Sequence, residues 1–194
     1  MFAKVTTGIG RGRFPARESV VPAIGVGVSG RSSYRGYGLQ QVDEKGRVAI
    51  PAPLRAALLA RSPTGDDGKP VTLVVLQAHE RHPCICGYDL DYAGLREAEL
   101  EERARLNALA DGAPDDDILR GGMVNDEQPF DTSGRFVMPG FPRKHARIGK
   151  WAFFHGIGRY FEIWDPATLI AAPGVHPNVR ALVEHELAER KVVL

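Results

Sequence analysis

The chain has 194 residues, of which 43% are hydrophobic and 25% are charged, as in ordinary soluble globular proteins. Its net charge of +1 does not by itself favour a nucleic-acid partner, because binding depends on where the charges lie. Its two cysteines are too few for a disulfide framework, and no apolar run is long enough to span a bilayer, so we expect a cytoplasmic protein.

The charges are distributed unevenly along the chain. Residues 1–35 contain six lysines and arginines against one glutamate, whereas residues 96–127 contain ten carboxylates against four arginines. Residues 1–33 are rich in Gly, Arg and Ser without hydrophobic periodicity, so we predict a disordered basic tail there. An organelle transit peptide is the alternative explanation for an Arg-rich, acid-poor start.

The globular part is expected to begin at Tyr34 with a β-rich unit. Asp43, followed three residues later by Gly46, marks a tight turn in which Asp accepts backbone N–H groups and Gly permits positive φ. The apolar residues 48–50 predict a short strand, and the proline that follows them suits the start of a helix. The elements expected next are that helix at 52–61 and strands at 71–77 and 84–88.

A helical segment is predicted after this unit. Residues 91–110 have the pattern of a long polar helix with a few leucine anchors, and residues 115–119 predict a short second helix.

The turn motif then occurs again, 88 residues after its first copy. Residues 43–51 (DEKGRVAIP) and 131–139 (DTSGRFVMP) share Asp, Gly, Arg, Pro and three apolar residues, and an arginine follows each copy at the same distance. Two copies in unbroken register indicate an internal duplication. The second copy predicts a helix at 140–147 and strands at 151–155 and 160–164. A unit of about 50 residues buries too little surface to be stable alone, so the copies are expected to share a core.

A C-terminal helix is predicted over residues 175–191, where apolar side chains recur at helical spacing. The predicted organisation is a tail (1–33), a first repeat (34–90), a helical linker (91–123), a second repeat (124–170) and a C-terminal helix (171–194).

Several segments match a known family. They are Tyr34-Arg35-Gly36, the doubled turn motif and Phe161-Glu162-Ile163-Trp164-Asp165, and over roughly residues 33–170 they resemble the MraZ family. Its members are transcriptional repressors of the bacterial division and cell-wall gene cluster, with two AbrB-like (SpoVT-type) swapped-hairpin halves. The resemblance implies an α+β, mainly β fold with two β-barrel repeats. It also implies a ring-like homo-oligomer that is associated with the nucleoid and binds double-stranded DNA at direct repeats in the promoter of its own operon.

Arg47 is the first candidate for DNA contact. Its planar guanidinium can bind two guanine acceptors or a phosphate, and it directly follows a tight turn. The other candidate DNA-binding residues are Lys45, Arg55, Arg135 and Arg143. Since the second copy has Thr132-Ser133 where the first has Glu44-Lys45, it is expected to contribute more to the fold than to DNA binding.

A structural role is the alternative for the motif arginines. Arg47 and Arg135 would then pair with Asp43 and Asp131 and fix their turns. The occurrence of the arginine in both copies does not distinguish DNA contact from a structural role, because a residue that the fold requires would also occur in both copies.

Metal-ligand residue types occur together at His79, His82, Cys84 and Cys86. Zinc sites generally use Cys-x-x-Cys with a second ligand pair, whereas Cys-x-Cys on a strand places both thiols on one face and favours burial. We therefore expect no metal, no cofactor and no enzyme. The functions kept as alternatives are an AbrB-type antitoxin and a metal-dependent enzyme that uses this cluster.

Overall fold

The computed structural model describes residues 32–111 and 116–194. Over these residues the chain forms six helices, a six-stranded antiparallel sheet and a separate two-stranded ribbon. The predicted α+β class is confirmed, but the fold is not mainly β, because helices contain more of the described residues than strands do. The predicted closed barrels are wrong, since the six-stranded sheet is open and ends in two edge strands. The predicted tail, residues 1–33, lies outside the described residues except for residues 32 and 33.

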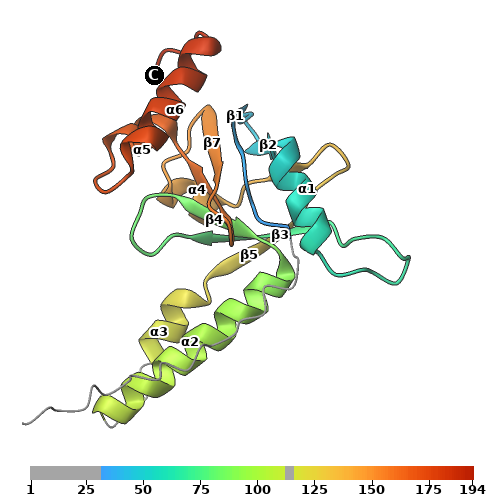
Figure 1. Cartoon of the computed structure of the whole chain (residues 1–194), viewed down its shortest axis with the longest axis vertical. Coiled ribbons are helices and arrows are strands. Elements are labelled where there is room, and N and C mark those ends of the chain that lie inside the picture. The colour runs from blue at the N-terminus through green and yellow to red at the C-terminus, as the bar shows by residue number, and fades with distance from the viewer. Residues whose placement is uncertain (1–31, 112–115) are drawn as a thin grey trace, which may run out of the picture.

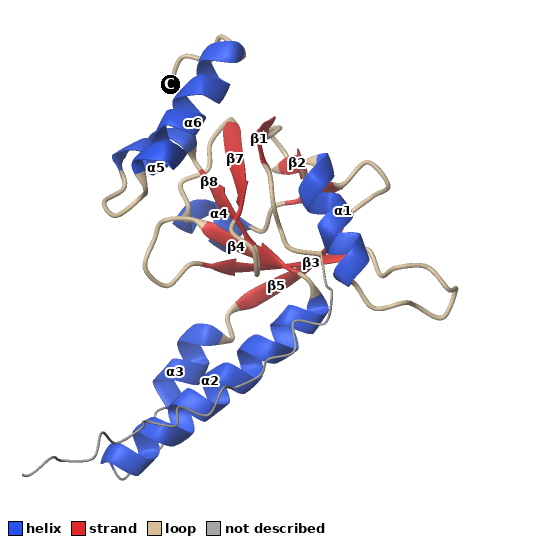
Figure 2. Cartoon of the chain, in the orientation of Figure 1, coloured by secondary structure: helices blue, strands red, loops and turns tan. Residues whose placement is uncertain are grey.

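The strands lie at the centre of the molecule and the helices lie around them (Figure 2). The strands are β1 (Tyr37–Gln41), β2 (Arg47–Ala49), β3 (Leu73–Ala78), β4 (Ile85–Tyr88), β5 (Asn125–Pro129), β6 (Arg135–Val137), β7 (Trp151–Gly156) and β8 (Phe161–Trp164). The helices are α1 (Ala52–Arg61), α2 (Leu90–Asp111), α3 (Asp116–Gly122), α4 (Gly140–His145), α5 (Pro166–Ala171) and α6 (Pro177–Glu189). Helices α2 and α3 project from the sheet as an arm, while α5 and α6 lie on the opposite side (Figure 1).

The two predicted repeats exchange strands. In the order β1-β7-β8-β4-β3-β5, strand β1 of the first repeat pairs with β7 of the second, and β5 of the second pairs with β3 of the first. The ribbon joins β2 to β6, and β4 pairs with β8 across the middle of the sheet. Only the β3–β4 and β7–β8 pairings stay within one repeat among the described strands.

The hydrophobic core follows from this exchange. Its largest cluster combines side chains of both repeats, including Val48, Leu54, Phe136, Met138 and Phe154. Burial of each such side chain contributes about 1.5–3 kcal/mol. A second cluster lies beneath α5 and α6 and contains Leu39, Phe153, Trp164, Leu169, Val183 and Leu187.

The structure adds elements that the sequence pattern did not indicate. Strands β1 and β5 precede the two turns, and helix α5 follows Asp165, whose carboxylate accepts the Thr168 N–H at 2.9 Å. The predicted helix 140–147 is too long. Helix α4 ends at His145, because Arg147 adopts a left-handed φ of 54° that an α-helix does not contain.

Candidate nucleic-acid interface

The two turns of the duplicated motif have the same geometry. In the first, Asp43 Oδ1 accepts the Arg47 N–H at 2.8 Å, and Gly46 has a φ of 79°. In the second, Asp131 Oδ1 accepts the Arg135 N–H at 2.9 Å, and the glycine has a φ of 80°. Because positive φ is unfavourable for residues with a side chain, Asp and Gly are structural in both copies.

Each turn rests on the other repeat. The Gly46 carbonyl accepts the Met138 N–H, and the Gly134 carbonyl accepts the Ile50 N–H, both at 2.9 Å. A Cβ atom at Gly46 would lie 3.1 Å from Arg143 Nη1, and one at Gly134 would lie 2.8 Å from Arg55 Cδ.

Arg55 and Arg143 are both half-buried. The structure therefore places these two predicted site residues under the turns, as the groups on which the turns pack.

The ribbon brings the two motif arginines to one face. Arg47 lies opposite Val137, and Ala49 lies opposite Arg135. Since side chains alternate along a strand, Val48 and Phe136 point into the core, while Arg47 and Arg135 lie diagonally across the other face.

That face of the ribbon borders an open groove of about 950 Å³. Arg47 and Arg135 both line it, together with Gln40 and Gln41 from the end of β1. These glutamines were not among the predicted site residues. The signal that could have found them is the pair of adjacent side-chain amides beside the turn motif, which indicates a surface available for hydrogen bonding.

The ion pairing of the two arginines differs. Arg47 Nε donates to Asp43 Oδ2 at 2.6 Å. The backbone N–H of Arg47 and then its side chain lower the pKa of the Asp43 carboxyl. By contrast, within the described part of the chain the Arg135 side chain is in no hydrogen bond or ion pair.

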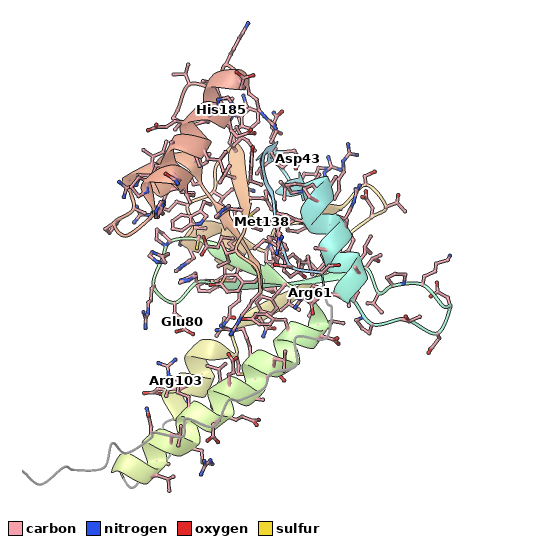
Figure 3. The ribbon with its side chains drawn as sticks, viewed as in Figure 1. Asp43, Arg61, Glu80, Arg103, Met138 and His185 are labelled. Atoms are coloured by element: carbon pink, nitrogen blue, oxygen red, sulfur yellow. The ribbon has the colours of Figure 1, made fainter. Side chains whose placement is uncertain are left out.

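The pairing proposed as an alternative is therefore present for Arg47. It uses one donor of the guanidinium and leaves the two terminal nitrogens for a ligand, so it does not exclude DNA contact. Lys45 is exposed at the same turn. Figure 3 shows Asp43 near β2 and well separated from Arg103 on the α2–α3 arm.

The residues of the histidine–cysteine cluster are engaged in burial and in backbone hydrogen bonds. Cys84 and Cys86 are buried, and burial raises the pKa of both thiols, that of Cys86 to about 12. His79 Nδ1 accepts the backbone N–H groups of Arg81 and His82. Among residues 32–111 and 116–194, no group of three or more His, Cys, Asp and Glu side chains is arranged to hold a metal ion.

No family model matches the chain. It is 36% identical over 154 residues to the "Transcriptional regulator MraZ" of Rhodospirillum rubrum, covering 73% of this chain and 84% of that protein. The MraZ of Gluconobacter oxydans is 33% identical over 137 residues, with coverage of 70% and 77%. That of Ruegeria sp. strain TM1040 is 34% identical over 137 residues, with coverage of 70% and 78%. These relatives are named as regulators and not as enzymes. Among the described helices, none has both the length and the apolar character needed to cross a membrane.

Proposed function

This chain belongs to the MraZ family of transcriptional regulators, and from that premise we propose that it binds double-stranded DNA sequence-specifically through the β2–β6 ribbon. The observation that carries the proposal is the position of Arg47 and Arg135 on one exposed face, lining one groove. A two-stranded ribbon fits the major groove of B-DNA, where arginine can bind guanine at two atoms. Gln40 and Gln41 in the same groove have amide groups that can bind adenine in the corresponding way.

The remaining candidate residues have different roles in this proposal. Lys45, exposed at the first turn, binds phosphate. Arg55 and Arg143 act indirectly. Each packs beneath one of the two turns and supports it, and the strands of the ribbon start at these turns. Arg135 takes a larger part than the sequence indicated, since its guanidinium has no partner among the described residues.

The biological role follows from the family. The protein acts as a repressor of the bacterial division and cell-wall gene cluster, including its own operon, and is associated with the nucleoid. It works as a ring-like homo-oligomer on direct repeats, because several ribbons that bind several repeats raise the affinity without any new contact. Its two strand-exchanged repeats correspond to the AbrB-like halves of the family.

A mobility-shift titration tests this function. The duplexes are DNA from upstream of the protein's own gene and a random sequence of the same length. The wild type should prefer the upstream duplex, and both Arg47→Ala and Arg135→Ala should reduce that preference, whereas Arg103→Ala on the arm should not. Equal binding of the wild type to both duplexes would overturn the proposal. Unchanged binding by both ribbon variants would remove the ribbon from it.

A further inference from the structure

The last turn of helix α4 and the segment from there to strand β7 carry a group of exposed cations. Lys144, Arg147 and Lys150 are all exposed, and within the described residues none of the three is in an ion pair. We refer to these three side chains as the cationic loop. Like charges close together repel one another, and no ion pair offsets that repulsion among the described residues.

The cationic loop is held against the first turn. Arg143 Nε and Nη2 donate to the carbonyls of Ile148 and Gly149, at 3.2 and 3.4 Å, and its Nη1 lies against Gly46. The Val42 N–H, one residue before the turn begins, donates to the Lys150 carbonyl at 2.8 Å. The loop therefore adjoins Lys45 and Arg47 and extends the same surface.

The charge of this loop is absent from the corresponding place in the first repeat. There, the connection after α1 contains Asp66, Asp67 and Lys69, and Lys69 Nζ lies 3.9 Å from Asp67 Oδ2. A group that the fold required would be expected in both copies, as Asp and Gly of the turns are. The positive charge of the cationic loop therefore occurs at one end of the ribbon and has no counterpart in the connection after α1.

The backbone of Arg147 gives an independent indication. Its φ of 54° lies in the left-handed region, which glycine adopts without strain and arginine does not. Glycine would serve the backbone better at this helix end, so the backbone conformation does not require an arginine here.

We propose that the cationic loop binds the DNA phosphates that flank the base pairs contacted by the ribbon. The inference rests on the proposed DNA-binding function and adds a second-repeat surface to it. Phosphate contacts fix the position of a protein on the duplex and carry no sequence information. Removing the loop's charges should therefore weaken binding to every duplex by the same factor, unlike removal of Arg47.

Fluorescence anisotropy over a range of salt concentrations, on the upstream duplex and the random duplex, tests this prediction. The variants are Arg147→Gly, the triple variant Lys144→Ala/Arg147→Gly/Lys150→Ala, Arg47→Ala, and Arg103→Ala as a charge-matched control on the arm. Arg147→Gly should lower affinity for both duplexes about fivefold, and the triple variant should make the slope of log K against log salt shallower by up to about 2.7. Because glycine is relaxed at this φ, Arg147→Gly should melt no lower than the wild type.

The outcomes separate the two proposals. If Arg47→Ala loses preference for the upstream duplex while the triple variant keeps wild-type affinity and slope, the cationic loop has no part in DNA binding. If the triple variant changes the sedimenting mass of the protein, the loop is a contact between copies of the chain and the inference is overturned. If the wild type binds neither duplex, the proposed function fails, and the inference fails with it.

Discussion

Arg61 donates from Nε to Oδ2 of Asp89 across 2.5 Å inside the protein, and the Tyr34 hydroxyl donates to the same oxygen at 2.9 Å. The other carboxylate oxygen of Asp89 accepts the Tyr92 N–H at the start of α2. Asp89 is fully buried and Arg61 nearly so. This one carboxylate thus ties the end of α1, the start of α2 and the first described residues together.

Removing Arg61 should therefore be costly. Arg61→Ala leaves the Asp89 charge buried without its cation, which is expected to lower the free energy of unfolding by about 3 kcal/mol. Urea denaturation measures the loss. The exposed pair of Arg105 and Glu102 is the control, since Arg105→Ala should cost under about 1 kcal/mol. Similar losses at both sites would contradict the structural role of Asp89.

Substitution of a turn glycine measures how tightly that turn packs against the opposite repeat. Gly134→Ala imposes a strained φ and places a Cβ atom 2.8 Å from Arg55 Cδ. We expect a loss of about 2–3 kcal/mol. Gly68 has a φ of 77° with nothing within 4 Å, so Gly68→Ala isolates the strain and should cost about 1 kcal/mol. Equal losses of unfolding free energy in the two variants would mean that the Arg55 side chain moves aside without cost.

Gly87 on β4 is required by its neighbour on β8. It pairs with Phe161, whose ring would lie 2.4 Å from a Cβ atom at this position. Gly87→Ala should destabilise the protein by more than about 3 kcal/mol, since neither the ring nor the central strands have room to move. Adding Phe161→Leu should recover part of that loss in thermal melts, and no recovery would place the strain elsewhere.

Stability should fall at high pH because of the buried thiols. The folded-state pKa of Cys86 is about 12, against an ordinary value of 9.0, so the unfolded chain loses this proton first as the pH rises. The contribution is complete below pH 9 and is lost between about 9 and 12 at up to 1.36 kcal/mol per pH unit. Urea titrations at pH 8, 9 and 10 should show the decline, and Cys86→Ala should make it shallower while the contribution of Cys84 remains. An unchanged slope in the variant would assign the effect to other groups.

The local parts of the fold could be predicted from the sequence, and the shared parts could not. The turns at Asp43 and Asp131, helix α1 and strands β3, β4, β7 and β8 follow from neighbouring residues, so their patterns were sufficient. Strands β1 and β5 were missed because sequences such as Asn125–Pro129 have no apolar alternation and become strands only by pairing across the repeats.

The candidate site shows the same division. The motif identified Lys45, Arg47 and Arg135, because a turn followed by an arginine is a local pattern. The packing of Arg55 and Arg143 beneath the turns, and the position of Gln40 and Gln41 in the groove, depend on contacts with residues far away in the sequence.

Strand exchange also orders the events of biosynthesis. Leu39 on β1 pairs with Phe153 on β7, which leaves the ribosome 114 residues later. At 5–20 residues per second, β1 waits roughly 6–23 s for its partner. During that interval, the nascent first repeat exposes unpaired strand edges and an incomplete core. A premature stop codon after the first repeat would consequently yield an aggregation-prone fragment, because the β2–β6 ribbon forms only when both halves are present.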